Sequence, residues 1–551
     1  MNLFGVSSTA LAISLLQAAD AFVLPTLFQE SFSVFEQDTL EVEDDGSSLV
    51  VAPAQSSFWD FIWKPHVPYL LKPMVDSEKL QGDIELDTLN ATAWELYDIA
   101  KASEKKYGHP TRVIGSRGHW KTLKYILDQF DEMSDYYDVS LQAFDALTGK
   151  INSFNLTDAK TGASFPNTTA FALSPAVKPF VGKLIEVPNL GCSEKDYQAV
   201  QSFESFANYK GRKIALIERG KCPFGKKSEL AGKHGFHAVV VYDNEPDAQD
   251  GALRGTLGEP TNTTVATVGV PHAVGKEMIA SIERMGDYLL CFAMDSYVKT
   301  IKTKNVVVDT KHGDPENIVA LGAHSDSVED GPGLNDDGSG TISLLTVAKQ
   351  LTHYKTNNKV RFAFWAAEEE GLLGSNFYAY NLTQNENHRI RVFMDYDMMA
   401  SPNYEYEVYD ANNKDHPRGS EELRDLYVDY YKDHRLNYTL VPLDGRSDYV
   451  GFIENGIPAG GIAAGAEKKN VFNGDILDKC YHQLCDDVLN LNWEAFLVNT
   501  RLIAHSVATY AESFEGFPER EVANNTVTAI SRAPAHRDTP LFKYRADDLL
   551  F

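Results

Sequence analysis

The side chains best suited to chemistry in this sequence are imidazoles and carboxylates that directly follow apolar runs. They are His324 and Asp326 after residues 318–322, Glu368 and Glu369 after residues 360–366, and Asp397 after residues 390–396. Imidazole nitrogen and carboxylate oxygen are ordinary ligands of zinc, and such a set needs no thiolate. One strand-end carboxylate would mean little, but three such ends with ligand-type residues indicate a metal site.

Two further segments add to this inventory. A glycine-rich turn at 331–340 contains Asp336 and Asp337, and the pair Tyr481-His482 lies between two cysteines. Two metals about 3.5–4 Å apart can share one carboxylate and one water. Each metal would then bind one imidazole and one further carboxylate, while a neighbouring unligated Glu takes a proton from the water. Asp326 could accept the second N–H of the first imidazole.

The elements that must position these residues alternate between strand and helix from about residue 306 onward. Apolar periodicity predicts strands at 318–322, 360–366 and 390–396 and helices at 338–351 and 371–381. Continuous apolar strands between amphipathic helices indicate a largely parallel sheet that is buried on both faces. Because ligands gather at the carboxyl ends of such strands, we expect the clustered residues to meet there.

The preceding part of the chain has a different pattern. Helices are predicted at 87–107 and 121–133. Between 146 and 299 the predicted strands are short and widely spaced, at 213–217, 238–242 and 267–270, with a helix at 226–234. Two or more structural units are therefore expected, in keeping with a length of 551 residues.

Five separated motifs, taken in order, resemble those of the zinc aminopeptidase family M28. They lie at 322–327, 331–340, 367–369, 397–398 and 481–483. Residues 212–224 resemble part of a protease-associated (PA) domain, which is inserted into the catalytic domain in a vacuolar group of this family in fungi. The resemblance implies an α/β fold, with a largely parallel mixed sheet flanked by helices (zinc-peptidase phosphorylase/hydrolase-like) and a small β-rich PA insert. It places the peptidase domain at 74–145 and 300–515 and the PA domain at 146–299.

The resemblance also implies a role for each motif residue. Of two zinc ions, one is bound by His324 and Asp397 and the other by Glu369 and His482, with Asp336 as the bridge. The remaining roles are general base for Glu368, orientation of His324 for Asp326, oxyanion stabilisation for Tyr481 and orientation of the substrate terminus for Arg446. Glu370 stands where the family more often has an apolar residue.

The expected activity is that of a metallo-aminopeptidase. It would release N-terminal residues, leucine-like and broad in range, with a water activated by two zinc ions and a Glu general base. Glutaminyl cyclisation occurs on a similar scaffold with one zinc, and receptor-like relatives have lost ligands. The complete set of five ligands argues against both alternatives. Glutamate carboxypeptidases share the site but act at C-termini and are usually membrane anchored.

Each cluster also has a simpler interpretation. The acids at 368–370 are typical of a helix start, and Asp336-Asp337-Gly338 is typical of a turn with an N-cap. A lone histidine is more often structural than a ligand. Ser447 could be a nucleophile, but the sequence contains neither a G-x-S-x-G elbow nor an H-E-x-x-H motif. The joint occurrence of the clusters in family order favours the catalytic interpretation.

Charge and composition exclude other classes of protein. The chain has 51 Lys and Arg against 78 Asp and Glu, a net charge of −27 that would repel the phosphates of nucleic acid. A 43% hydrophobic content is typical of a globular protein and excludes intrinsic disorder. Past the N-terminal segment, no run reaches the roughly 18 apolar residues of a membrane span. The expected partners are peptides with a free N-terminus, and a monomer is expected.

Both ends of the chain are expected to lie outside the folded domains. Residues 1–21 combine an apolar stretch with Ala19-Asp20-Ala21, which is typical of a signal peptide. Residues 22–73 are interpreted as a pro-segment or acidic spacer, and residues 516–551 as a tail. N-x-S/T sequons that fit a secretory route lie at Asn90, Asn155, Asn167, Asn262, Asn381, Asn437 and Asn524. The expected location is the secretory pathway, either secreted or in a vacuolar lumen.

Five cysteines fit an oxidising compartment. Cys480 and Cys485 are close enough in sequence to form a small disulfide. Cys192 and Cys222 could pair within one domain, which leaves Cys291 as an odd, buried thiol.

Overall fold

The computed structural model describes residues 41–44, 47–50, 68–202, 204–244, 253, 255–258 and 260–520. The predicted signal peptide, most of the 22–73 segment and the sequon at Asn524 lie outside these residues. Strands β1 (Glu41–Asp44) and β2 (Ser47–Val50) pair with each other in a unit separate from the rest of the described chain. Among the described residues, the search for helices that could cross a membrane finds none.

A mixed sheet forms the centre of the larger unit. Strands β10 (Asp314–His324), β11 (Asn358–Trp365), β12 (Ile390–Tyr396) and β15 (Ala459–Ala463) run parallel, in the order β11-β10-β12-β15. Strand β13 (Tyr406–Tyr409) pairs antiparallel with β15, and β14 (Tyr438–Val441) pairs parallel with β13 at the edge. This sheet confirms the predicted fold, and the bounds of β12 coincide with those predicted.

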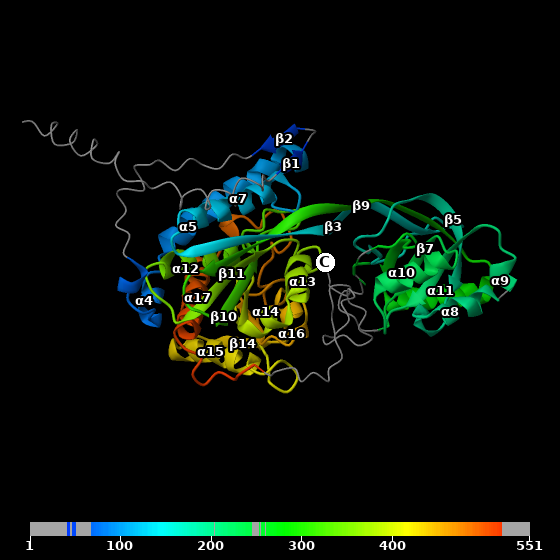
Figure 1. The fold of residues 1–551 in the computed structure, drawn as a ribbon. Helices are drawn as coiled ribbons and strands as arrows, with labels where there is room; N and C mark the ends of the chain where they lie inside the picture. Colours follow the sequence, from blue (N-terminus) through cyan, green and yellow to red (C-terminus); the bar gives the residue numbers. More distant parts are fainter. Residues whose placement is uncertain are drawn as a thin grey trace, which may run out of the picture. The chain divides into compact units, whose positions relative to one another are not determined.

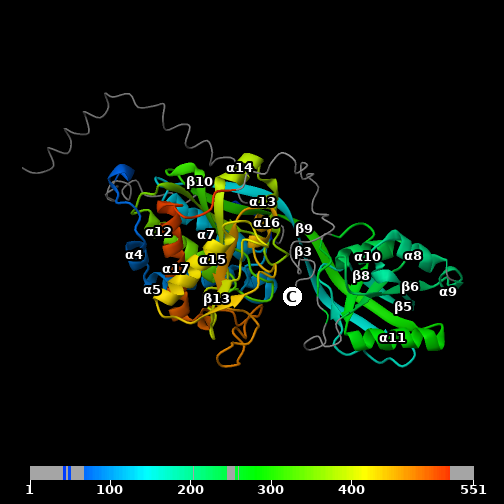
Figure 2. The ribbon, with the colours of Figure 1, turned by 90° about the horizontal axis from the view of Figure 1, so that it is seen from below.

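Alternate side chains of the central strands enter two different cores, because successive residues of a strand point to opposite faces. Val319 and Leu321 pack with helices α5 (Leu86–Ala100), α7 (Arg117–Asp131), α12 (Gly338–Leu351), α15 (Ser420–Asp433) and α17 (Trp493–Glu512). Ile318 and Ala320 pack on the other face with α13 (Leu373–Asn381) and α16 (Tyr449–Glu454). Figures 1 and 2 show these helices around the sheet. The sheet is therefore buried on both faces, as its apolar strands predict.

A second set of parallel strands forms the inserted segment. Strands β5 (Val177–Glu186), β6 (Arg212–Glu218), β7 (Ala238–Tyr242) and β8 (Ala266–Val270) lie side by side, with β4 (Thr169–Ala170) at the edge. One face packs on α11 (His272–Met285), and the other packs on α8 (Glu194–Gln201) and α10 (Phe224–Lys233). The three strands and the helix predicted here are all present.

A long antiparallel ribbon joins the two sets of parallel strands into one continuous sheet. Strands β3 (Tyr137–Asp158) and β9 (Leu289–Thr310) each span 22 residues, and they pair from Tyr137 and Thr310 to Asp158 and Leu290. Figure 1 traces this ribbon between the central strands and the insert. The predicted domain bounds at 146 and 299 fall inside these two strands, where composition changes but the ladder of hydrogen bonds continues.

The remaining elements are short or peripheral. They are η2 (Tyr69–Leu71), α4 (Ser77–Gly82), η3 (Lys101–Ser103), α6 (Glu104–Tyr107), η4 (Asn189–Gly191), α9 (Glu204–Ala207), α14 (Gln384–Arg389) and η5 (Val488–Asn490). The described start of the predicted tail packs on the body, because Phe517 is buried in the larger core and Arg520 donates to the carbonyl of Ile390.

Candidate metal centre

The carboxyl ends of three neighbouring parallel strands meet at one edge of the central sheet. His324 is the last residue of β10, Asp397 directly follows β12, and Glu368 and Glu369 follow β11. The glycine-rich turn reaches the same edge because α12 starts close to β12. A side chain at Gly340 would lie 2.1 Å from the carbonyl oxygen of Tyr396, so only glycine permits this approach.

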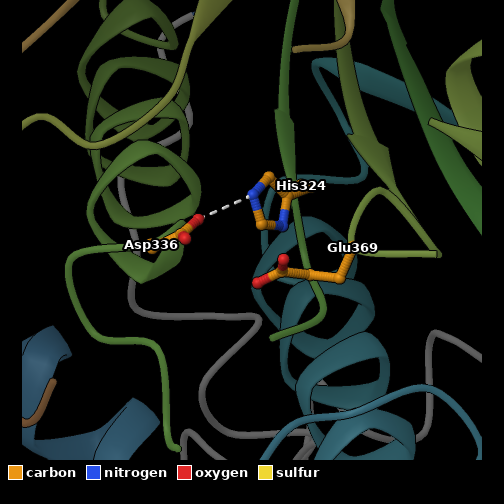
Figure 3. A group of neighbouring side chains, drawn as sticks. All are labelled: His324, Asp336 and Glu369. Atoms are coloured by element: carbon orange, nitrogen blue, oxygen red, sulfur yellow. Dashed lines mark hydrogen bonds and ion pairs between the residues drawn. The ribbon is translucent and has the colours of Figure 1, made fainter. Parts of the chain in front are cut away.

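Asp336 lies between two imidazoles. Its Oδ1 is 3.1 Å from Nε2 of His324, and its Oδ2 is 3.0 Å from Nε2 of His482. Figure 3 shows the side chains of Asp336, His324 and Glu369 gathered around one point, and ligand atoms of these three lie within 4.8 Å of one another. A carboxylate whose two oxygens address two imidazoles has the arrangement that a bridging ligand requires.

The adjacent Asp337 is engaged differently, although its carboxylate also lies near His324 and Asp397. Its Oδ1 accepts the backbone N–H groups of Gly340 at 2.8 Å and Met398 at 3.2 Å, and its Oδ2 accepts that of His324 at 3.0 Å. Asp337 therefore caps α12 and ties three loops together. These contacts distinguish the two neighbouring aspartates.

Each imidazole also faces one further carboxylate. Glu369 Oε2 is 3.1 Å from Nε2 of His482, while its Oε1 accepts the backbone N–H of Val328 at 2.9 Å. Asp397 Oδ1 is 3.7 Å from Nε2 of His324 and has no hydrogen-bond donor among the described residues. Asp397 Oδ2 accepts from Ser447 at 3.0 Å. The five predicted ligands thus form two imidazole-carboxylate sets around Asp336.

The charges at this site favour a bound cation. Burial disfavours charge on His482, but Glu369 and Asp336 raise its pKa to about 10. Burial acts in the same way on His324, yet Glu368, Asp336 and Asp397 raise its pKa well above the ordinary value. The surrounding carboxylates stabilise a positive charge on each imidazole, and they would stabilise a metal cation at the same place. Nitrogen and oxygen donors in this number fit zinc, so the residues present fit the metal that the sequence predicts.

Glu368 and Asp326 both lie close to His324. Burial, with Asp448, Glu369 and Asp397, raises the pKa of Glu368 well above its ordinary value, against the opposing effect of His324. Asp326 accepts the backbone N–H of Glu368 at 3.3 Å and that of Glu369 at 3.4 Å. Its Oδ1 is 3.7 Å from Nδ1 of His324, which is longer than a hydrogen bond. In this structure Asp326 therefore holds the turn that carries both glutamates.

Tyr481 and Arg446 lie together at the same site. The Tyr481 ring stacks on His482 with 3.8 Å between ring centroids, and its hydroxyl accepts from Arg446 at 3.2 Å. Arg446 donates to both oxygens of Glu467, at 2.9 and 3.1 Å. Sequence analysis did not find Glu467, because it lies outside every motif and 21 positions from Arg446.

The loop that carries Tyr481 and His482 is fixed at both ends. A disulfide joins Cys480 to Cys485 with an S–S distance of 2.08 Å. Before it, Asp478 accepts from the side chain of Asn335 at 2.7 Å; after it, Asp486 accepts the backbone N–H groups of Asn335 at 2.9 Å and Asp336 at 3.1 Å. These anchors were missed by sequence analysis, although acids that flank a cysteine pair are a visible pattern.

Arg112 is a further residue that could not be found from sequence. Its guanidinium is fully buried and donates to the carbonyls of Ser325, Pro332 at 2.9 Å and Gly333 at 2.5 Å. It thereby joins the loop after His324 to the glycine-rich turn. Asp326 and Asp337 balance its charge through space.

A pocket of about 630 Å³, open to solvent, lies beside Asp336, Glu368 and Asp397. Part of its wall is apolar, and part of it is charged. The apolar residues are Met398, Tyr409, Val441 and Pro442, and the charged residues are Glu407, Asp444, Arg446 and Lys468. The pocket therefore has an apolar wall close to the ligand cluster.

The other predicted sites lie away from this centre. A disulfide joins Cys192 to Cys222 in the insert, and Cys291 is free and half-buried, where a buried thiol was expected. The sequon residues Asn155, Asn167, Asn262, Asn381 and Asn437 are exposed, and Asn90 is half-buried on α5. Glu370, which follows Glu369, is half-buried and accepts from Thr148 of the ribbon at 3.2 Å.

Known proteins resemble this chain in both of its domains. Residues 305–507 match peptidase family M28, and residues 180–278 match the PA domain. The chain is 68% identical to aminopeptidase Y of Saccharomyces cerevisiae over 533 residues, 96% of either chain. It is 39% identical to leucine aminopeptidase 2 of Arthroderma otae, over 82% of this chain and 89% of the relative. An aminopeptidase from Aneurinibacillus sp. strain AM-1 superposes with a TM-score of 0.63 at 26% identity, covering 82% of this chain and 98% of that one.

Proposed function

Because the chain belongs to peptidase family M28 and is a zinc-dependent aminopeptidase, we propose that its strand-end site holds two zinc ions. His324 and Asp397 bind one ion, Glu369 and His482 bind the other, and Asp336 binds both. The observation that carries this proposal is that the two oxygens of Asp336 lie 3.1 and 3.0 Å from two different imidazoles.

The residues around the ligands have the remaining catalytic and positioning roles. When bound, zinc supplies a Lewis acid that polarises a carbonyl and lowers the pKa of water. Glu368 takes the proton of the attacking water and passes it to the leaving amine, a role that its raised pKa favours. Tyr481 donates to the oxygen that becomes negative, and Asp326 holds the turn that carries Glu368 and Glu369.

The substrate is a peptide with a free N-terminus. A free α-amine would be recognised by the metal and the nearby carboxylates, whereas an acylated N-terminus would not. A leucine-like first side chain suits the apolar wall, which is formed by Met398, Tyr409, Val441 and Pro442. Because the pocket is open, it suits a broad range of first residues.

The chain acts in the lumen of the secretory pathway, as a secreted or vacuolar enzyme. This proposal is supported by the disulfides Cys192–Cys222 and Cys480–Cys485, since such bonds persist in oxidising compartments. The exposed sequons are proposed to carry glycans.

Hydrolysis of leucine p-nitroanilide, compared with its N-acetyl derivative, tests this function. The account predicts cleavage of the free amine alone, loss of cleavage after chelation, and recovery when zinc is restored. Cleavage of the acetylated compound would contradict the exopeptidase assignment, and activity that survives complete chelation would contradict the role of zinc.

A further inference from the structure

We infer that Glu467 is a positioning residue that sets the direction of the Tyr481 hydroxyl through Arg446. This inference rests on the proposed function, because it takes Tyr481 as the donor to the developing oxyanion. It gives Arg446 a role within the enzyme rather than a direct hold on the substrate terminus.

The contacts form a relay of three side chains. Arg446 donates two parallel hydrogen bonds to Glu467, at 2.9 and 3.1 Å, which fixes the plane of the guanidinium. The nitrogen that completes the second of these bonds also donates to the hydroxyl of Tyr481 at 3.2 Å. The orientation of Glu467 is thus transmitted to the phenol oxygen by two rigid groups.

The direction of these bonds determines what Tyr481 can do. A guanidinium has donors only, so the Tyr481 oxygen must be the acceptor in its contact with Arg446. The hydroxyl proton is then left to point elsewhere, and Tyr481 lines the same pocket as Glu368 and Asp336. A donor held in advance toward the place where negative charge develops is what lowers a barrier of this kind.

Without Glu467, other carboxylates would compete for Arg446. Asp444 and Glu407 line the same pocket and interact with Arg446 through space. The guanidinium would turn toward them and leave the Tyr481 hydroxyl. A plain surface ion pair predicts something different, namely an unaltered catalytic step.

The test measures kcat and KM for Glu467→Gln, Tyr481→Phe and the double variant. Loss of one oxyanion donor costs roughly 100-fold or more in kcat. We expect that loss for Tyr481→Phe and about a tenfold loss for Glu467→Gln, with KM within about twofold of the wild type. Because Glu467 acts through Tyr481, the double variant should be no slower than Tyr481→Phe alone. Glu421→Gln, which removes a comparable pair with Arg424 on α15, is the matched control and should leave kcat unchanged.

A second readout is independent of turnover. In metal-free protein with 3-fluorotyrosine at position 481, the ¹⁹F resonance should shift on Glu467→Gln and stay in place on Glu421→Gln. Unchanged kcat and an unshifted resonance for Glu467→Gln, while Tyr481→Phe is slow, would overturn the inference and leave the proposed function intact. Losses that simply add in the double variant would overturn it as well. A fast Tyr481→Phe enzyme would instead remove the oxyanion role of Tyr481 from the proposed function.

Discussion

The side-chain amide of Asn335 donates to Asp478 at 2.7 Å, across 143 positions of sequence. This bond joins the turn that carries Asp336 to the loop that carries His482. Asn335 and Asp478 are both buried. Asn335 also accepts the backbone N–H of Ala400 at 3.0 Å and donates to Ser401 at 3.0 Å. The spacing of the two imidazoles therefore depends on a buried polar network as well as on the ligands themselves.

Asn335→Ala should weaken both the fold and the metal site. Partners left unsatisfied in the interior cost about 1–3 kcal/mol each, so we expect a loss of roughly 2–4 kcal/mol in the free energy of unfolding. Zinc affinity, measured by competition with a chromogenic chelator, should fall in parallel. Asn473→Ala removes an exposed amide and is the control. Equal stability and affinity in the two variants would refute the structural role of Asn335.

Removal of the Cys480–Cys485 disulfide should act locally. A disulfide that closes a loop of this size lowers the conformational entropy of the unfolded chain, which stabilises the fold by roughly 2 kcal/mol. We expect the Cys480→Ser, Cys485→Ser variant to lose about that much stability and to bind one zinc of two more weakly, because His482 lies inside the loop. The paired control is Cys192→Ser, Cys222→Ser, which should destabilise the insert while both zinc affinities stay the same. A uniform effect of both pairs on zinc would contradict this account.

Arg112→Met should be strongly destabilising. The guanidinium is fully buried and donates to three backbone carbonyls in two catalytic loops. Loss of these donors, together with a buried positive charge close to Asp326 and Asp337, is expected to lower the free energy of unfolding by about 3–5 kcal/mol. Urea denaturation measures this change. Lys414→Met, at a side chain that is 88% exposed, should change stability by less than about 0.5 kcal/mol.

Glu407 should make stability depend on pH. Burial raises the pKa of this carboxyl from 4.5 to about 7. The folded state therefore binds the proton more tightly than the unfolded state does. The stability that this proton contributes is complete below pH 4.5, declines between pH 4.5 and 7, and is absent above pH 7. Glu407→Gln should raise the free energy of unfolding relative to the wild type by up to about 3 kcal/mol at pH 8.

At pH 4.5 the same substitution should have little effect, because the wild-type carboxyl is then protonated in the folded state and already half protonated in the unfolded state. Thermal unfolding at the two pH values measures the difference. The matched control is Glu421→Gln, whose carboxylate lies on the surface of α15. A gain of the same size at both pH values would contradict the assignment to Glu407.

Residues that follow apolar runs could be identified from sequence because a strand that ends at a parallel sheet edge must deliver the next side chain there. That reasoning located His324, Glu368 and Asp397, and the helix at 338–351 has the predicted bounds. Glu467, Asn335 and Arg112 could not be found in this way. Each of them forms hydrogen bonds to residues that lie 21 to 221 positions away, and the local sequence does not predict such contacts.

Domain bounds and one short interior strand were also hard to derive. The ribbon strands β3 and β9 pass through the bounds at 146 and 299 without a turn, so a change in composition there did not coincide with a change in structure. Strand β15 contains Gly460 and Gly461, and a side chain at Gly461 would lie 2.0 Å from the carbonyl oxygen of Asp395. Close packing requires glycine there, which hides the apolar pattern that predicts a strand.

The number of zinc ions per chain is the measurement that tests the central claim most directly. Elemental analysis of the purified protein should give two zinc ions for the wild type and two for Glu368→Gln, because Glu368 acts as a base and not as a ligand. Asp336→Ala should lose both, since Asp336 faces both imidazoles. A wild-type protein that holds one zinc ion, or an Asp336→Ala variant that keeps two, would contradict the account.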